Sequence, residues 1–386
     1  MHSFISDSQF KLGILGGGQL GKMLILSTAD YDIFTKVLDP DAHCSSATFC
    51  NEFVCGSFAD YETVLNFGKD CTAVTVEIEH VNTDALRELK KRGVQVHPDP
   101  DALDTIRDKG LQKQFYQQHG LATSAFFLTE NEQEIRDKVQ NGELTFPFVQ
   151  KARTGGYDGK GVKVVKTAND LTDLLPGPSV IEEAVKIKKE LAVIVAKSAM
   201  SPEPVAFDVV DMEFNPDANL VEFLFCPAQV SPEIQEKAVK LAKETLKAYG
   251  INGLLAVELF LDDNDNILIN EVAPRPHNSG HHTIDSCITS QFEQHWRSVL
   301  DLPLGDTTSK TAAVMVNILG EAGYTGQVKY QGMESALATP GVKFHIYGKK
   351  TTKPFRKMGH FTVLSDNLND AVSKARTIKN QLKVIA

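Results

Sequence analysis

Long apolar segments are missing from this chain of 386 residues. No apolar run approaches the roughly 20 residues that a membrane-spanning helix needs, which excludes a helical membrane protein. Residues 1–10 also lack the basic region followed by an apolar core that marks a secretory signal. We therefore expect a cytoplasmic protein that acts neither in a membrane nor after secretion.

Metal-finger and disulfide signatures are absent as well. The cysteines form no C-x-x-C pair and show no finger spacing with histidine, so we expect them to be reduced and structural. This argues against a zinc site or a disulfide framework. The cysteines are Cys44, Cys50, Cys55, Cys71, Cys226 and Cys287.

An excess of positive charge is the third absence. The 40 basic residues are outnumbered by 50 acidic ones, giving a formal charge of −10. This balance disfavours nonspecific binding to nucleic acid, but it permits a local basic pocket for a phosphorylated small molecule. The length is enough for two or three domains, and the 42% of hydrophobic residues is ordinary for a globular protein.

Residues 270–281 carry the densest group of ionisable and amide side chains. Their sequence is Asn-Glu-Val-Ala-Pro-Arg-Pro-His-Asn-Ser-Gly-His, and neither a buried strand nor an ordinary loop requires so many functional groups. We interpret this segment as part of an active site.

A β-hairpin is predicted to lead into that segment. Apolar runs at residues 257–261 and 267–271 are separated by a turn rich in Asp and Asn. With the turn centred between residues 264 and 265, Glu258 lies opposite Glu271, with Cβ atoms about 5 Å apart.

Two opposed carboxylates on an apolar hairpin repel each other and lose hydration, so they need a compensating charge. A divalent cation with oxygen ligands supplies it, and Mg²⁺ is the natural candidate, with Mn²⁺ as a possible substitute. Glu258 and Glu271 are then the metal ligands, and Asn270 offers a third oxygen. The alternative is a shift of one residue in register, which would separate the carboxylates.

The first hundred residues alternate strands with helices. A strand at residues 10–15 leads into Gly16-Gly17-Gly18-Gln19-Leu20-Gly21 and a helical run, and further apolar runs follow up to residue 96. Such alternation predicts a parallel sheet covered by helices. We expect an α/β domain over residues 1–105.

The glycine run satisfies G-x-G-x-x-G through Gly16, Gly18 and Gly21, and Asp39 lies near the place of a ribose-binding acid. This supports an alternative function, a nicotinamide- or flavin-dependent oxidoreductase. Glycine-rich turns before helices also bind plain phosphates, or form tight turns that bind nothing.

A second glycine cluster, residues 154–161, connects two strands. Lys151 and Lys160 add positive charge to a loop whose backbone N–H groups can cover a polyphosphate. It lacks the spacing of a Walker A loop. Downstream, Glu182 and Glu190 can accept hydrogen bonds from an adenine amino group or a ribose hydroxyl; solvated charges at strand ends are the alternative.

In this order and spacing, these motifs resemble the ATP-grasp superfamily. Within it, the first glycine loop, residues 154–161, residues 270–281 and the stretch Pro-Phe-Arg-Lys-Met-Gly-His at 354–360 resemble N5-carboxyaminoimidazole ribonucleotide synthetases, the ATPase subunits of phosphoribosylaminoimidazole carboxylase. The resemblance spans nearly the whole chain. It implies an ATP-grasp fold with an N-terminal parallel-sheet α/β domain and a small C-terminal β-rich region.

The resemblance implies carboxylation of 5-aminoimidazole ribonucleotide with ATP and bicarbonate, through carboxyphosphate, in purine synthesis. The ATP-binding positions are Arg107, Lys151, Gly156, Tyr157, Asp158, Gly159, Lys160, Gly161, Val162, Glu182, Glu183, Ala184, Val185, Glu190, Asn270 and Glu271. The positions for the ribonucleotide are Gln19, Glu79, Tyr157, Asp158, Arg275, Asn278, Lys349 and Arg356.

Four of these positions are assigned catalytic roles. Asp158 would orient the amine or take its proton, and Arg275 would hold bicarbonate or the transferring phosphoryl group. Lys349 and Arg356 would bind the ribonucleotide phosphate, although their lysine-rich surroundings also fit a solvated basic turn.

The sequence departs from the family at Asn215, where relatives commonly carry a histidine that contacts ATP. A related alternative is formate-dependent glycinamide ribonucleotide transformylase, which shares a similar Pro-Arg-Pro-His segment. The expected domains are residues 1–105, an ATP-grasp unit at 106–310 with a lid at about 115–190, and a β-rich region at 311–386. The resemblance also implies a homodimer.

Overall fold

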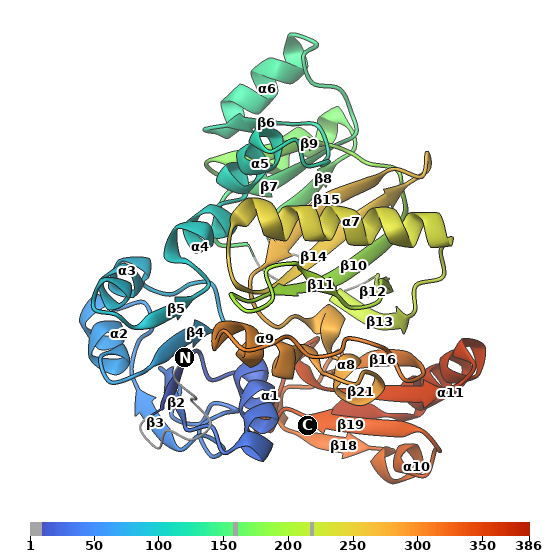
Figure 1. Ribbon diagram of the computed structural model, residues 1–386. Coiled ribbons are helices and arrows are strands. Elements are labelled where there is room, and N and C mark those ends of the chain that lie inside the picture. Colours follow the sequence, from blue (N-terminus) through green and yellow to red (C-terminus); the bar gives the residue numbers. More distant parts are fainter. Residues whose placement is uncertain (1–9, 157–160, 217–219) are drawn as a thin grey trace.

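The structure, a computed structural model, describes residues 10–156, 161–216 and 220–386 (Figure 1). Its N-terminal part is the predicted parallel sheet, with strand order β3-β2-β1-β4-β5. The strands are β1 (Leu12–Leu15), β2 (Thr35–Asp39), β3 (Glu52–Cys55), β4 (Ala73–Val76) and β5 (Gln95–His97). The helices around it are α1 (Gln19–Thr28), α2 (Tyr61–Gly68), α3 (Thr83–Lys91) and α4 (Pro100–Arg107), with a short 3-10 helix η2 (Ala29–Tyr31).

The strand order places the glycine loop at a topological switch point. The chain continues from β1 to β2 on one side and reaches β4 on the other. Loops that follow the carboxyl ends of two such strands diverge and leave a crevice in which open α/β sheets bind ligands. The loop after β1 contains Gly16–Gly18, and the loop after β4 contains Glu77 and Glu79.

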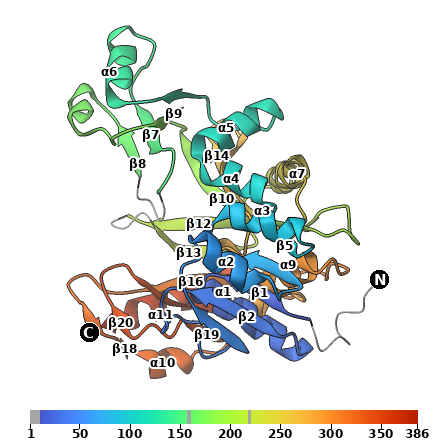
Figure 2. The same cartoon turned by 90° about the vertical axis from the view of Figure 1, so that its left-hand side faces the viewer.

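A small antiparallel sheet, with strand order β6-β9-β7-β8, follows the N-terminal part. It stands apart from the rest of the molecule in Figure 2. Its strands are β6 (Phe126–Thr129), β7 (Phe148–Ala152), β8 (Val162–Val165) and β9 (Ser179–Glu183). The helices α5 (Lys109–Gln118) and α6 (Glu132–Gln140) and the 3-10 helix η3 (Ala168–Asp173) accompany it. Its own core contains Ile135, Phe148 and Ile181, which explains how it can stand apart.

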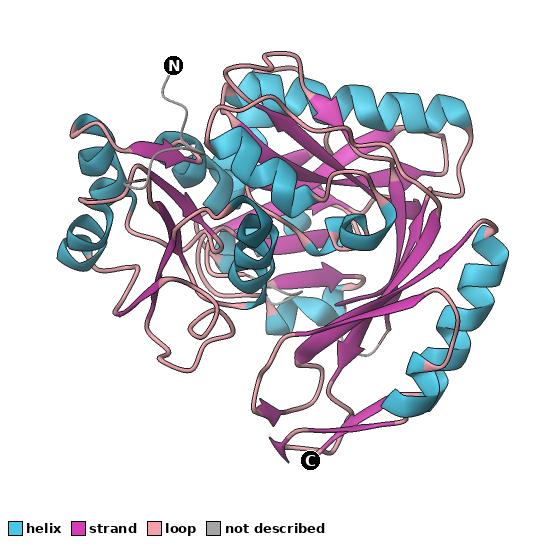
Figure 3. Ribbon diagram, turned by 60° about the horizontal axis from the view of Figure 1, so that its bottom comes forward, coloured by secondary structure: helices cyan, strands magenta, loops and turns pink. Residues whose placement is uncertain are grey.

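A large antiparallel sheet forms the centre of the molecule (Figure 3). Its main path is β15-β14-β10-β12-β13-β16-β21-β19, and β11 (Val205–Ala206) pairs with β10. The first part contains β10 (Ile187–Lys197), β12 (Val210–Asn215), β13 (Leu220–Cys226), β14 (Gly253–Asp262) and β15 (Ile267–Ala273). Helix α7 (Pro232–Tyr249) packs on this part through Ala238, Ala242 and Leu246.

The strands β16 (Ala312–Leu319), β19 (Val342–Ile346) and β21 (Lys357–Ser365) extend the same sheet, so the β-rich C-terminal region continues the central one. Helix α11 (Leu368–Gln381) covers it with Ala371, Ala375 and Ile378. The remaining elements are η4 (Asn278–Gly280), α8 (Thr283–Ser286), α9 (Gln291–Val299), α10 (Met333–Leu337), β17 (Gly326–Gln327), β18 (Lys329–Gln331), β20 (Thr351–Thr352) and β22 (Lys383–Ile385). Within the described ranges, no helix is long and apolar enough to cross a membrane.

The predicted hairpin is β14–β15, and Glu258 lies opposite Glu271 as predicted. The turn itself is centred one half-residue earlier than predicted, because Leu261 pairs with Ile267. A bulge at Asn270 restores the predicted pairing, since Leu259 pairs with Ile269 while Glu258 pairs with Glu271. Such an extra residue re-aims side chains next to a site.

Candidate active site

A buried carboxylate with two lysines lies where the small sheet meets α5. Glu182 of β9 lies 3.0 Å from Lys151 of β7 and 3.2 Å from Lys113 of α5. Ser124 Oγ donates a hydrogen bond to the same carboxylate at 2.6 Å. Burial alone would raise the pKa of Glu182, but the two lysines lower it below its ordinary value, whereas burial lowers the pKa of Lys113 to about 8. Two cations share one anion, so the cluster can accept a further anion such as a polyphosphate.

The cluster continues directly into the hairpin. Lys151 Nζ donates a hydrogen bond to Asn270 Oδ1 at 2.9 Å, and Lys109 Nζ lies 2.5 Å from Glu271 Oε2. On the facing strand, Glu258 Oε1 lies 3.6 Å from His277 Nε2. The structure therefore brings together residues that are up to 168 positions apart in the sequence, from Lys109 to His277.

Three carboxylates create a strongly negative region on β10, β14 and β15. Burial raises the pKa of Glu258, and the neighbouring Glu271 and Glu190 raise it further. Burial raises the pKa of Glu190 to about 7, whereas Lys109 lowers the pKa of Glu271. The Glu258 side chain is 14% exposed and that of Glu271 is 44% exposed. Repulsion among hard oxygen donors that remain reachable fits a divalent cation such as Mg²⁺.

The protein would not enclose such a cation alone. Over the described ranges, no three His, Cys, Asp or Glu side chains gather as a complete metal site. The two hairpin carboxylates would therefore share the cation with outside ligands, which is how Mg²⁺ is held beside nucleotide phosphates.

Arg275 connects this region to the N-terminal domain. Its Nε lies 2.8 Å from Glu79 Oε1, in the loop after β4. Three residues further on, Asn278 exchanges two side-chain hydrogen bonds with Asn317 of β16, at 2.7 and 3.0 Å. Gln19 is the first residue of α1, which begins at the same switch point. Four of the expected ribonucleotide positions, Gln19, Glu79, Arg275 and Asn278, thus lie where the N-terminal sheet meets the segment after the hairpin.

The glycine loop binds the protein's own carboxylates. Gly17 N–H donates to Asp39 at 2.7 Å, and Gly18 N–H donates to Glu77 at 2.6 Å. A Cβ atom on Gly18 would lie 2.5 Å from a Glu77 oxygen, so the close approach needs glycine. Because these N–H groups already have anionic partners, they do not offer a dinucleotide pyrophosphate its usual site. The oxidoreductase alternative is therefore wrong.

The partly buried Glu77 gives a test of this arrangement by pH. Burial raises its pKa to about 7, above the ordinary 4.5, although Gly18 N–H opposes the shift. The unfolded carboxyl ionises first, so the folded state loses stability as the pH rises from 4.5 through 7. Glu77→Gln removes this penalty. We expect the unfolding free energy of the variant, relative to the native chain, to increase by about 1–3 kcal/mol between pH 5 and pH 8.

Urea unfolding at the two pH values measures this difference. Glu62→Gln, at an exposed position of α2, is the control and should show no such change. An equal effect of Glu77→Gln at both pH values would contradict the assignment.

The remaining predicted ATP-binding residues lie at the end of β9 and around the second glycine cluster, and Asn215 lies at the end of β12. Glu183 ends β9, with Ala184 and Val185 directly after it. Gly161 accepts a hydrogen bond from Ala152 N–H at 2.8 Å and precedes Val162, the first residue of β8. Gly156 is the last described residue of this loop before Gly161. Outside the described residues lie Tyr157, Asp158, Gly159 and Lys160. Asn215 Nδ2 donates to Glu222 at 3.3 Å.

Lys349 and Arg356 lie on the connection between β19 and β21. Lys349 Nζ donates to Lys357 O at 2.8 Å, and Arg356 Nη1 donates to Thr351 O at 2.8 Å. These hydrogen bonds give the connection a fixed shape. Lys22 of α1 donates a hydrogen bond to Ile346 O at 2.9 Å. This bond links the start of the connection, at the end of β19, to the helix that follows the glycine loop.

Arg107, a predicted ATP-binding residue, is the last residue of α4 and precedes the N-cap of α5. Arg107 contacts Val81 O and Asp104, both in the N-terminal domain, at 3.0 Å. Two residues later, Lys109 reaches Glu271 instead, because a new helix begins there with Asp108 as its N-cap. Sequence reasoning missed Lys109 and Lys113, although their spacing of four predicts a shared helical face.

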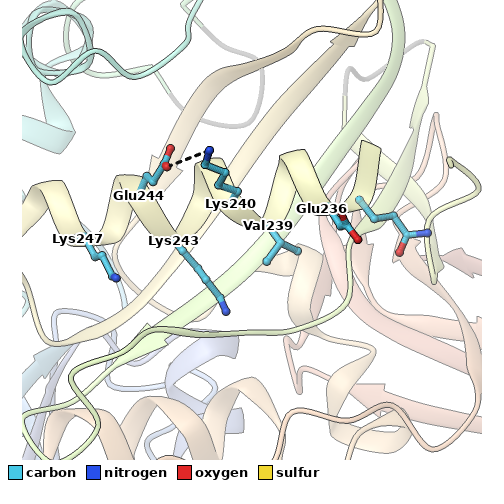
Figure 4. A pocket seen from close by; sticks show the side chains of 7 residues that line it. Glu236, Val239, Lys240, Lys243, Glu244 and Lys247 are labelled. Carbon is cyan, nitrogen blue, oxygen red and sulfur yellow. Dashed lines mark ion pairs between the residues drawn. The ribbon is translucent and has the colours of Figure 1, made fainter. Parts of the chain in front are cut away.

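A surface hollow of about 520 Å³ lies along α7 (Figure 4). Its lining includes Val239, Lys243 and the ion pair of Lys240 with Glu244. It shares no residue with the cluster described above, and its charges lie on a solvated helix face. The site therefore lies at the junction of the small sheet, the hairpin and the N-terminal crevice.

Comparison with known proteins agrees with this arrangement. Residues 10–107 match the ribonucleotide synthetase pre-ATP-grasp domain, residues 114–292 the ATP-grasp domain, and residues 313–374 the phosphoribosylaminoimidazole carboxylase C-terminal domain. The chain therefore has the ATP-grasp fold, together with the pre-ATP-grasp and C-terminal domains of ribonucleotide synthetases. It resembles N5-carboxyaminoimidazole ribonucleotide synthetase from Thermotoga maritima, with a TM-score of 0.88 and 39% identity over 98% of this chain and 99% of that one.

The chain belongs to the N5-carboxyaminoimidazole ribonucleotide synthetase family. It is also similar to the Aspergillus clavatus enzyme solved with ADP and 5-aminoimidazole ribonucleotide, with a TM-score of 0.88 and 32% identity over 96% of this chain and 98% of that one. The phosphoribosylaminoimidazole carboxylase of Candida glabrata is 36% identical over 379 residues. These cover 95% of this chain but 65% of that protein, so the chain spans about two thirds of the length of this relative.

Proposed function

We propose that the protein carboxylates the exocyclic amine of 5-aminoimidazole ribonucleotide, using ATP and bicarbonate, in purine biosynthesis. The products are N5-carboxyaminoimidazole ribonucleotide, ADP and phosphate. One observation carries the proposal: the lysine-rich cluster around Glu182 joins the opposed carboxylates Glu258 and Glu271 beside the crevice that Arg275 borders. Such a junction suits a reaction between a nucleotide and a second, anionic substrate.

The lysines and carboxylates suit ATP. Lys109, Lys113 and Lys151 would surround its phosphates, while Glu190 and the end of β9 would accept hydrogen bonds from the adenine amino group and a ribose hydroxyl. Mg²⁺ or Mn²⁺ held by Glu258 and Glu271 would neutralise charge on the transferring phosphoryl group. Lys109 would then exchange its contact with Glu271 for one with phosphate.

The chemistry requires activation of bicarbonate, because bicarbonate is a poor electrophile. A bicarbonate oxygen attacks the γ-phosphorus, and the bond to the β–γ bridging oxygen breaks to release ADP and leave carboxyphosphate. The amine nitrogen then bonds to the carboxyl carbon as the carbon–oxygen bond to phosphate breaks. The amine proton goes to a base, for which Asp158 is the proposed residue.

Arg275 would act in the first of these steps. Its guanidinium, oriented by Glu79, can hold bicarbonate or the transferring phosphoryl group with paired N–H donors. Lys349 and Arg356 would bind the phosphate of the ribonucleotide, and Asn278 with Gln19 would border its ring. Because carboxyphosphate reacts with water, the closed site must exclude water.

A homodimer, which the family resemblance implies, and the cytoplasmic location that we expect from the sequence complete the proposal.

Release of phosphate from Mg-ATP by the purified protein tests the proposal. In bicarbonate buffer, addition of 5-aminoimidazole ribonucleotide should accelerate release by about 10-fold or more, since the second substrate completes the reacting geometry. Glycinamide ribonucleotide with formate is the parallel test for the related transformylase. Stimulation by that pair alone, or by neither substrate, would overturn the proposal.

A further inference from the structure

A row of aromatic rings lies at the junction of η4, α9 and the C-terminal strands. The rings of His345 and His360 stack with centroids 4.6 Å apart and an interplanar angle of 15°. His360 lies 4.7 Å from His281, which lies 5.9 Å from Phe292. His360, His281 and Phe292 are fully buried. The chemistry proposed above uses none of these rings.

Each histidine is also held by a hydrogen bond. His345 Nε2 lies 2.8 Å from Asp285, His360 Nδ1 lies 3.0 Å from the Tyr347 hydroxyl, and His281 Nδ1 lies 3.1 Å from Gln291 Nε2. Packing buries the rings, and these hydrogen bonds also fix the orientation of each ring.

Gln291 extends this support to the segment before η4. Its side chain donates to His277 O at 2.7 Å and accepts from His277 N–H at 2.9 Å. Each end of the amide group therefore holds the same residue, which directly precedes Asn278. The segment between Arg275 and His281 is thus held in one shape from α9.

The row connects two parts of the proposed ribonucleotide site. His281 comes three residues after Asn278, whereas His345 and His360 flank the connection that carries Lys349 and Arg356. Asn278 and the basic connection belong to different segments of the chain, and a displacement of either would separate the groups that contact one substrate.

Burying imidazoles here has a cost that apolar rings would avoid. Burial lowers the pKa of His281 and of His360 well below the ordinary value, and nearby Lys357 and His345 act in the same direction on His281. The rings of His281 and His360 are therefore neutral and pack together without repulsion between them. Among the described residues, His360 Nε2 has no hydrogen-bond partner.

We propose that His281, His360 and His345 are positioning residues, whose stacked rings hold Asn278 and the Lys349–Arg356 connection in register for the aminoimidazole ribonucleotide. This inference rests on the proposed function. It predicts that loss of the central ring weakens use of the ribonucleotide while leaving use of ATP unchanged.

The test compares His360→Ala with His360→Phe. The alanine variant interrupts the row, so we expect the KM for the ribonucleotide to rise about 10-fold or more, because small displacements at a site cost this much. The KM for ATP should stay within about twofold of the native value. Phenylalanine restores a stacking ring and should bring the ribonucleotide KM to within about threefold of the native value. His119→Ala, at the exposed end of α5, is the control and should change neither constant.

An unchanged ribonucleotide KM in His360→Ala, or equal increases for both substrates, would overturn the inference. If the alanine variant does not fold, Asp285→Asn weakens only the support of His345 and should still raise the ribonucleotide KM selectively, by about threefold. Failure of the proposed function is distinct, because the native protein itself would then show no release that depends on the aminoimidazole.

Discussion

Replacing Glu258 by glutamine is expected to lower the kcat of the aminoimidazole-dependent reaction by about two to three orders of magnitude. The substitution keeps the shape of the side chain but removes one of the two charges opposed on the hairpin. The divalent cation would lose a charged ligand at the point where the phosphoryl group develops charge. Phosphate release at saturating ATP and ribonucleotide measures the loss.

The same substitution is expected to raise the melting temperature of the metal-free protein at alkaline pH, by about 2–4 °C. Glutamine removes both the cost of burying the Glu258 charge and its repulsion by Glu271 and Glu190, which together raise the pKa of Glu258 in the native chain. Loss of activity together with increased stability distinguishes a functional charge from a structural one.

Glu203→Gln is the matched control, because Glu203 forms an exposed ion pair with Lys247 at 2.7 Å. It should change kcat by less than a factor of about two, as exposed ion pairs contribute little. Full activity of Glu258→Gln, with an unchanged dependence on Mg²⁺, would contradict the role given to the hairpin carboxylates.

Replacing Arg275 by glutamine is expected to lower kcat by about 100- to 1,000-fold, while the affinity for ADP stays within about twofold. Arg275 lies beyond the hairpin, on the side of Glu79, so in the proposed reaction its charge would act on the second substrate and the transferring group and not on bound nucleotide. Phosphate release and calorimetric titration with Mg-ADP measure the two quantities separately.

Arg376→Gln is the control for the loss of an arginine–glutamate pair, since Arg376 lies 2.7 Å from Glu213 on the surface. It should leave kcat within about a factor of two. An equal loss of ADP affinity and of kcat in Arg275→Gln would place Arg275 in the nucleotide site instead.

Features set by local sequence could be predicted. The alternation of apolar and turn residues identified the parallel N-terminal sheet and the β14–β15 hairpin, including the pairing of Glu258 with Glu271. The bulge at Asn270 could not be predicted, because it depends on how β15 meets Lys151 of the small sheet. The predicted pairing of Glu258 with Glu271 is correct because the bulge offsets the half-residue error in the predicted centre of the turn.

Features set by contacts between distant segments were missed. Arg107 and Lys109 are equally basic, and only the break between α4 and α5 at Asp108 decides which one faces Glu271. The glycine loop matched a dinucleotide-binding motif because that motif specifies only the spacing of the glycines and not the acceptors of their backbone N–H groups. Here Glu77, 59 residues after Gly18, takes that place. The continuity of β16, β19 and β21 with the central sheet is likewise a matter of non-local pairing.

Transfer of oxygen from bicarbonate to phosphate tests the central claim most directly. With ¹⁸O-labelled bicarbonate, ATP and 5-aminoimidazole ribonucleotide, the reaction through carboxyphosphate should give inorganic phosphate that carries one labelled oxygen per turnover, detected by mass spectrometry. Phosphate labelled only when the label is supplied as water, in amounts that match ADP formation, would contradict the account.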